Sequence, residues 1–388
     1  MYPHQSERLT EALDAAGVDA LVATAAANVR YVTGFESVVP GRAGGEILAV
    51  FARGAATALV VPAAEAPGIV IDGPSADVVR CHGELPLAKG DGEDAHRVAA
   101  LVDATAPAPA GALAAALAQL GVSGRIGLDE SGLTARAWRA LVAGLEGREP
   151  IEASTALRRA RAVKGPWEIE AAQRALRAAE ESLNAVIQML APGVSEREAV
   201  TLWRREVDAR GARPVAAVIA TGARAALPAA APSDRALRAG EVVRFDVCCS
   251  WQGYHATLGR TAVMGAPTSR IEAAHAAAQA GLEAAIDSIR PGVAAGGLVA
   301  AALERAPAAG SDGVRLAASG HGVGLSPSEA PTLARGGDER LEAGMVLALE
   351  TAWYDIGLAG VQVKDTVLVT RVGATVLNGS VRGLVILD

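Results

Sequence analysis

Two acidic residues interrupt segments that otherwise have the composition of buried strands. Asp246 ends the segment AGEVVRFD at residues 239–246, and Glu350 ends AGMVLALE at residues 343–350. A carboxylate in a buried strand costs free energy unless a cation, a hydrogen-bond donor or a ligand compensates it. These two acids therefore predict either a polar functional site or an internal salt bridge.

The two acidic segments also resemble each other. Both begin with Ala-Gly, alternate apolar residues and reach their carboxylate at the eighth position. Each is followed by a glycine-containing turn, SWQGYH or YDIGLAG, and then by another strand-like run. This internal echo predicts two structural halves that direct their acids into one pocket, with chance similarity of two strands as the alternative.

A histidine and a lysine add further chemistry. His321 lies in the glycine-rich stretch GHGVGLSPSEAP, and Lys364 lies in QVKDTVLVT. The glycines leave room for another group to approach the backbone or His321. From the residues alone, His321 can be a metal ligand, an acid or base, or the remnant of a lost site.

Strand alternation groups further side chains with these residues. Asp246 and Cys248 are expected on one face of their strand, and His255 and Thr257 share a face of the following strand, in GYHATLGRT. Cys248 is a candidate nucleophile or substrate contact, but a buried strand cysteine is more often core filler. His255 can equally be an exposed turn residue.

The bulk properties exclude several function classes. Apolar residues make up 51% of the 388-residue chain and charged residues 20%, which is enough to bury sizeable cores. The net charge of −7, without a basic cluster, argues against nucleic acid as a partner. No apolar run is long enough to span a membrane, and the first residues lack a signal-peptide pattern, so we expect a cytoplasmic protein.

The chain divides into two regions. Helix-like and strand-like patterns alternate in the first, with a hairpin-like pair of apolar runs at residues 45–62, and this alternation is typical of an α/β domain. The pattern then changes, and Pro166 suits the first turn of a long helix. We place the first domain at residues 1–155 and the second at residues 156–388.

The second region resembles the pita-bread hydrolases, the superfamily of aminopeptidase P, prolidase, methionine aminopeptidase and creatinase. The matching pieces occur in that family's order: LRRARAVKGPWEIEAAQRAL, LPAAAPSDRALRAGEVVRFD, GYHATLGRTAVMG, GHGVGLSPSEAP, LEAGMVLALETAWYD and GVQVKDTVLVT. The first region resembles the creatinase/prolidase N-terminal domain, most clearly in ALDAAGVDALVATAAANVRYVTGF. The resemblance implies a two-domain α/β architecture: a creatinase-like N-terminal α/β domain and a C-terminal pita-bread α+β domain with an internal pseudo-twofold repeat.

Metallopeptidases of this family hold two divalent metal ions with two aspartates, one histidine and two glutamates. Asp246, His321 and Glu350 match three of these ligands. The second aspartate position is Thr257 here, and the second glutamate position is Lys364. The resemblance therefore implies the fold of a metallopeptidase but only part of its ligand set.

Two further family positions also differ. The transition-state histidine of the family, seven residues after the metal histidine, corresponds to Ser328, and the histidine that usually follows Leu-Pro corresponds to Ala229. In the creatinase branch, which works without metal, that last histidine is the central acid/base. Both known forms of the chemistry thus lack parts here, and His255 is a candidate for the missing imidazole.

Charge favours a site without metal. A lysine beside two carboxylates repels a divalent ion and can itself neutralise Asp246 and Glu350. We therefore expect no dinuclear centre, no bound metal and no cofactor. A mononuclear centre on Asp246, His321 and Glu350 stays conceivable, because two carboxylates and one histidine can hold iron, zinc or manganese.

The sequence thus predicts a metal-independent, hydrolase-like enzyme acting on an amide or other C–N bond of a small amino-acid-derived substrate. Glu350, with a pKa raised by burial, is the expected general base, with His321 as an acid or base and Lys364 as the cation for a developing oxyanion. The expected substrate contacts are Asp246, His255, Thr257, Ser328 and Cys248. The resemblance implies a homodimer, and we expect no nucleic-acid or membrane partner. Two alternatives stay open: a non-catalytic pseudoenzyme that binds a partner, and a mononuclear Xaa-Pro metallopeptidase.

Overall fold

The computed structural model describes residues 2–388 apart from 40–44, 74–75, 89, 146 and 306–314. Its internal contacts separate the chain into two compact units, Met1–Arg161 and Ala162–Asp388. Residue 155, where the sequence analysis ended the first domain, lies at the start of α7 (Ser154–Ala162). None of the helices in the described part of the chain combines the length and the apolar composition needed to cross a membrane.

The first unit contains a mixed sheet with the strand order β4-β3-β2-β1-β5-β6. β2 and β3 form the antiparallel hairpin expected in residues 45–62, and Gly54 in its turn has a φ of 87°, which glycine adopts without strain. The strands are β1 (Ala20–Ala23), β2 (Leu48–Ala52), β3 (Thr57–Pro62), β4 (Val78–His82), β5 (Ile126–Leu128) and β6 (Ile151–Glu152). The helices before α7 are α1 (Pro3–Ala16), α2 (Ala26–Thr33), η1 (Ala63–Glu65), α3 (Ala66–Asp72), α4 (Glu93–Asp103), α5 (Pro109–Gln119) and α6 (Ala135–Ala143).

The second unit is built around one large sheet with the order β11-β10-β12-β13-β9-β8-β7, to which β14 and β15 add short pairings. Its strands are β7 (Arg213–Thr221), β8 (Val242–Trp251), β9 (Tyr254–Met264), β10 (Leu316–Gly322), β11 (Glu329–Leu333), β12 (Val346–Asp355), β13 (Ala359–Val369), β14 (Ala374–Val376) and β15 (Val385–Leu387). Its helices are α8 (Pro166–Met189), α9 (Glu196–Ala209), η2 (Gly222–Ala226), α10 (Ser269–Asp287) and α11 (Ala295–Arg305). Pro166 opens α8, as its position in the sequence predicted.

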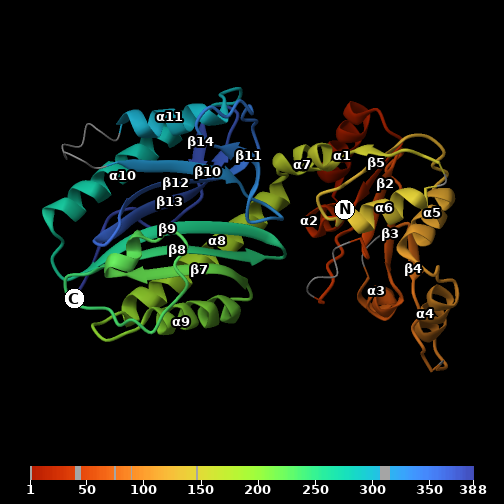
Figure 1. Cartoon of the computed structure of the whole chain (residues 1–388), viewed down its shortest axis with the longest axis horizontal. Coiled ribbons are helices and arrows are strands. Elements are labelled where there is room, and N and C mark those ends of the chain that lie inside the picture. Colours follow the sequence, from red (N-terminus) through yellow and green to blue (C-terminus); the bar gives the residue numbers. More distant parts are fainter. Residues whose placement is uncertain (1, 40–44, 74–75, 89, 146, 306–314) are drawn as a thin grey trace. The chain divides into compact units, whose positions relative to one another are not determined.

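The second unit repeats one arrangement twice. Two helices, α8 and α9, precede β7 and the hairpin β8–β9, and two more, α10 and α11, precede β10 and the hairpin β12–β13. The halves meet where β9 pairs with β13, and Figure 1 shows each helix pair beside its own strands. The echo between the two acidic segments in the sequence is therefore structural, because they form the equivalent strands β8 and β12.

Both helix pairs cover the same face of the sheet. Phe245 and Val247 of β8 pack into a core with α8 and α9, and Leu349 of β12 packs into a core with α10 and α11. Because side chains alternate along a strand, Asp246 and Glu350 project from the opposite face, which carries no helix from these pairs. The fold thus supplies apolar packing on one face and leaves the other for polar groups.

Candidate functional site

The register of the sheet aligns five residues in a row across its helix-free face. Asp246 on β8 lies opposite Gly259 on β9, and Gly259 lies opposite Lys364 on β13. Lys364 in turn lies opposite Glu350 on β12, which lies opposite Ser319 on β10. Residues that are far apart in the sequence therefore become cross-strand neighbours on one face.

Gly259 creates the space through which Lys364 reaches Asp246. A Cβ atom at this position would come within 2.9 Å of the Lys364 Cβ and within 3.2 Å of the Gln362 side chain. The absence of a side chain on β9 lets the lysine stem cross that strand to Asp246. Thr257 and His255 in the same stretch were candidate site residues from the sequence, whereas this glycine was not.

The Lys364 ammonium lies between the two acids. Its Nζ is 2.8 Å from Asp246 Oδ1, 3.0 Å from Asp246 Oδ2 and 2.8 Å from Glu350 Oε2. The lysine side chain is 9% exposed, whereas those of Asp246 and Glu350 are 23% and 25% exposed. The acids therefore meet solvent along one side, while the cation between them is almost fully enclosed.

The charges set the pKa values of this group. Burial opposes the charged form of Lys364, but Asp246 and Glu350 outweigh it and raise the pKa of the ammonium above its usual range. Burial acts to raise the pKa of Glu350, yet the Lys364 charge and hydrogen bonds from Lys364, Ser319 and Gln362 hold this pKa below its usual value. The expectation of a raised pKa for Glu350 was therefore wrong, because the cation lies in direct contact with the carboxylate.

Gln362 is a member of the site that the sequence analysis missed. Its Nε2 donates to Asp246 Oδ2 and to Glu350 Oε2, both at 3.0 Å, and Ser319 Oγ donates to Glu350 Oε1 at 2.9 Å. Gln362 lies two residues before Lys364 on β13, so strand alternation alone could have placed it on the same face. The amide and the ammonium together connect the two carboxylates.

His321 is held as a neutral imidazole. Its Nδ1 contacts Gly322 O at 3.0 Å, and because a carbonyl only accepts hydrogen bonds, Nδ1 carries the proton and Nε2 carries the lone pair. Burial lowers the pKa of His321, and the positive charge of Lys364 acts in the same direction. At neutral pH the ring can therefore accept a proton at Nε2.

The structure places the other predicted site residues as follows. Thr257 lies opposite Cys248 in the row next to Asp246, and its Oγ1 donates to Val247 O at 3.0 Å. Burial raises the pKa of the Cys248 thiol to about 12, which keeps it protonated at neutral pH. His255 is half-buried, and its Nδ1 contacts Gly324 O at 2.9 Å, which ties β9 to the segment after His321.

The segment that contains Ser328 is fixed by a buried ion pair. Ser328 itself is exposed in the bend between β10 and β11. Glu329, the next residue, accepts from Ser326 N at 2.9 Å and lies 3.2 Å from Lys164 Nζ, with both charged side chains nearly inaccessible to solvent. A Cβ on Gly324 would collide with both partners, at 2.7 and 2.9 Å. Lys164 and Glu329 were not singled out from the sequence.

The described side chains do not fit the pair of divalent metal ions that metallopeptidases of the resembling family hold. Among them, no group of three histidine, cysteine, aspartate or glutamate residues is arranged to hold a metal ion. The Lys364 ammonium lies 2.8 Å from an oxygen of Asp246 and 2.8 Å from an oxygen of Glu350, and it would repel a cation placed beside it. These side chains are arranged as an ion cluster instead.

Comparison with known proteins gives the family. Residues 170–371, slightly more than half of the chain, match the Metallopeptidase family M24, and residues 5–163 match the Creatinase/Prolidase N-terminal domain. The chain is 34% identical over 239 residues to the probable dipeptidase PepE of Mycobacterium bovis, across 61% of this chain and 64% of that protein. It is 30% identical over 226 residues to the Xaa-Pro dipeptidase of Pyrococcus furiosus, across 58% of this chain and 65% of that protein. The aligned part is thus less than two thirds of these relatives' length.

Solved structures agree over nearly the whole chain. The Xaa-Pro dipeptidase from Bacillus anthracis matches with a TM-score of 0.82 at 23% identity, over 99% of both chains. The dipeptidase PepE from Mycobacterium ulcerans matches with a TM-score of 0.77 at 26% identity, over 99% of this chain and 97% of that one. The expected two-domain pita-bread architecture is therefore confirmed, and the chain belongs to the Metallopeptidase family M24, with a creatinase/prolidase N-terminal domain.

Proposed function

We propose that this chain is a hydrolase that cleaves an amide or other C–N bond of a small amino-acid-derived substrate without a bound divalent metal ion. The observation that carries the proposal is the position of Lys364 Nζ, within 2.8 Å of an oxygen of both Asp246 and Glu350. In this proposal the ammonium occupies the place that metal ions hold in metallopeptidases of the same fold. It balances the negative charge of two adjacent carboxylates without a metal.

His321 is the general base of the proposed reaction. Its neutral ring takes a proton from water at Nε2 while the water oxygen attacks the substrate carbonyl, and it returns this proton to the leaving nitrogen. Its Nδ1 stays bonded to Gly322 O and fixes the orientation of the ring. Lys364 supplies positive charge for the oxygen that becomes negative in the transition state.

Glu350 and Asp246 act as ionised groups in this scheme. With its pKa held below the usual value, Glu350 is a weak base, so it orients water or binds a positively charged part of the substrate. Asp246, 23% exposed, is proposed to contact the substrate in the same way. The other proposed substrate contacts are His255, Thr257, Cys248 and Ser328.

A site that binds a ligand without turnover is the second candidate function. Lys364 and Gln362 already satisfy oxygens of both carboxylates, and an acid that is neutralised internally has less capacity to move protons. This arrangement also suits a protein that recognises a small ligand or a partner.

The family resemblance further predicts a homodimer, and both this dimer and a cytoplasmic location stay predictions.

One experiment separates these possibilities. The metal content of the purified protein is measured by mass spectrometry, and hydrolysis of Xaa-Pro dipeptides, N-acyl amino acids and guanidino acids is assayed with EDTA and with added Mn²⁺ or Zn²⁺. Turnover that persists in EDTA and is lost in His321→Ala, but not in the exposed control His96→Ala, supports the proposal. Turnover that requires added metal overturns it in favour of a mononuclear metallopeptidase. Ligand binding without any turnover favours the second candidate.

A further inference from the structure

The side chain of Arg244 is completely enclosed by the protein although it carries a charge. Arg244 lies on β8, two residues before Asp246, and is 0% exposed. Among the described residues its hydrogen-bond acceptors are all uncharged: Ala225 O at 2.7 Å, Leu227 O at 2.6 Å, Pro228 O at 3.2 Å and Gln362 Oε1 at 2.8 Å. An enclosed guanidinium costs much free energy unless negative charge lies close to it.

The negative charge is reached through Gln362. The Gln362 amide accepts from Arg244 at Oε1 and donates from Nε2 to Asp246 Oδ2 and Glu350 Oε2. Two cations, Arg244 and Lys364, thus balance two carboxylates in one connected cluster. Lys364 contacts the acids directly, whereas Arg244 acts on them through the amide.

Arg244 also decides which way the Gln362 amide points. The oxygen and nitrogen of a glutamine amide are distinguished only by their hydrogen-bond partners. Because a guanidinium only donates, it fixes Oε1 toward β8 and leaves both Nε2 hydrogens for the carboxylates. Without Arg244, Oε1 loses the donor that anchors the amide on the side away from the carboxylates.

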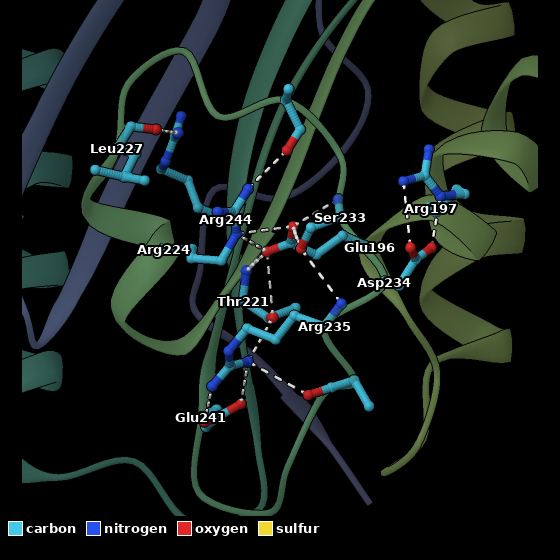
Figure 2. A network of polar contacts seen from close by, with 12 residues as sticks. Glu196, Arg197, Thr221, Arg224, Leu227, Ser233, Asp234, Arg235, Glu241 and Arg244 are labelled. Carbon is cyan, nitrogen blue, oxygen red and sulfur yellow. Dashed lines mark hydrogen bonds and ion pairs between the residues drawn. The ribbon is translucent and has the colours of Figure 1, made fainter.

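The carbonyls that Arg244 binds belong to a segment with its own anchor. Figure 2 shows this segment, residues 221–235, arranged around the buried Glu196 carboxylate. Glu196 accepts from Thr221 N at 3.0 Å, Ser233 N at 3.0 Å, Ser233 Oγ at 2.7 Å and Arg224 Nε at 3.0 Å. Glu196 holds the two ends of the segment, and Arg244 holds its middle at Leu227 and Pro228.

We propose that Arg244 is a positioning residue that fixes the Gln362 amide toward Asp246 and Glu350 and connects the acid pair to the 221–235 segment. The role rests on the proposed function, since the acid pair is the part of the site that it orders. A substrate that displaces the backbone at Leu227 or Pro228 would act on the carboxylates through three consecutive hydrogen bonds, by way of Arg244 and Gln362. Arg244, Gln362 and Lys364 therefore form one connected cluster with the two acids.

The test uses the side-chain amide signals of Gln362 in the full-length protein. These signals are assigned in a ¹⁵N–¹H spectrum by their loss in Gln362→Met. With both hydrogens bound to carboxylates, they are expected downfield and slow to exchange with water. In Arg244→Met the same signals should move to ordinary positions and exchange rapidly, a change that general loosening of the fold would not confine to one amide.

Two further variants control the test. Arg244→Lys keeps the charge but cannot donate to Gln362 and to the segment carbonyls at the same time. It should therefore also lose the downfield, slowly exchanging Gln362 amide signals. This variant replaces Arg244→Met in the test if Arg244→Met fails to fold. Arg197→Met removes an exposed ion pair with Asp234 of the same segment without touching Glu196, Arg244 or Gln362, and it should leave the amide signals in place. Unchanged amide signals in both Arg244 variants, or an equal change in Arg197→Met, would overturn the proposal. The readout needs no turnover, so it succeeds or fails independently of the proposed hydrolysis.

Discussion

Lys364→Met removes the cation from between the two acids while keeping most of the apolar stem. Asp246 and Glu350 then face each other with the neutral Gln362 amide as their shared donor. Two ionised carboxylates in one partly buried site repel each other, so the pKa of one of them rises. The variant is therefore expected to be less stable and to take up a proton at a pH where the native site does not.

The burial of the group sets the size of this effect. Removing one partner of a fully buried ion pair costs about 3–5 kcal/mol. The acids here are 23% and 25% exposed, so water replaces part of the lost interaction. Because of this exposure, we expect a smaller loss than for a fully buried pair, about 2–4 kcal/mol in the free energy of unfolding at pH 8.

The stability difference between Lys364→Met and the native protein is expected to change with pH in a definite direction. In the native protein the pKa of Glu350 lies below its usual value, so its contribution to stability is present above the unfolded-state pKa, near 4.3, and is lost as the pH falls further. In Lys364→Met, protonation of one acid relieves the repulsion as the pH falls. The difference between the two proteins should therefore be largest near pH 8 and narrow toward pH 5. Because the pKa of Lys364 is raised in the folded protein, the contribution of its charge to the free energy of unfolding is fully present up to about pH 10. This contribution is lost as the pH rises further.

Urea unfolding at pH 8 and pH 5, followed by tryptophan fluorescence, measures this difference. Four of the five tryptophans lie in the second unit, so fluorescence reports mainly on the unit that holds the site. Arg197→Met is the control, because it breaks an exposed ion pair with Asp234 and should change stability by less than about 1 kcal/mol at either pH. Equal stability of Lys364→Met and the native protein at pH 8, or a difference that grows toward pH 5, would refute the proposed role of the ammonium.

Three further predictions concern other parts of the chain. Thr257→Asp combined with Lys364→Glu should gain Mn²⁺ binding by calorimetry, whereas Thr257→Asp alone should not; no binding by the double variant would contradict the assignment of both positions. Asp129→Asn should destabilise the first unit by about 2 kcal/mol at pH 7, because hydrogen bonds lower the pKa of Asp129 to about 2 despite its burial, and urea unfolding should show this difference disappear as the pH falls from about 4 to 2. The buried Cys248 thiol should resist iodoacetamide in the folded protein at pH 7.5 and react after unfolding, as intact mass would show; rapid labelling of the folded protein would identify it as a nucleophile instead.

Local patterns in the sequence determined many of the elements and which residues are candidates for the site. Alternation along the strands placed Asp246 and Cys248 on one face, and the echo between two acidic segments predicted the two halves of the sheet. The occurrence of threonine and lysine at family metal-ligand positions directed attention to Lys364. These inferences could be drawn because they depend on residues close together in the chain or on a motif already known as a unit.

Only the tertiary structure decided how the charges are compensated. Pairing of β9 with β13 joins residues about a hundred positions apart, and no local pattern encodes that register. It places Gly259 where Lys364 must cross, Gln362 against both acids and Arg244 behind the amide. The direction of the Glu350 pKa shift follows from these contacts, since burial and a neighbouring cation act in opposite directions and only their distances decide which one prevails.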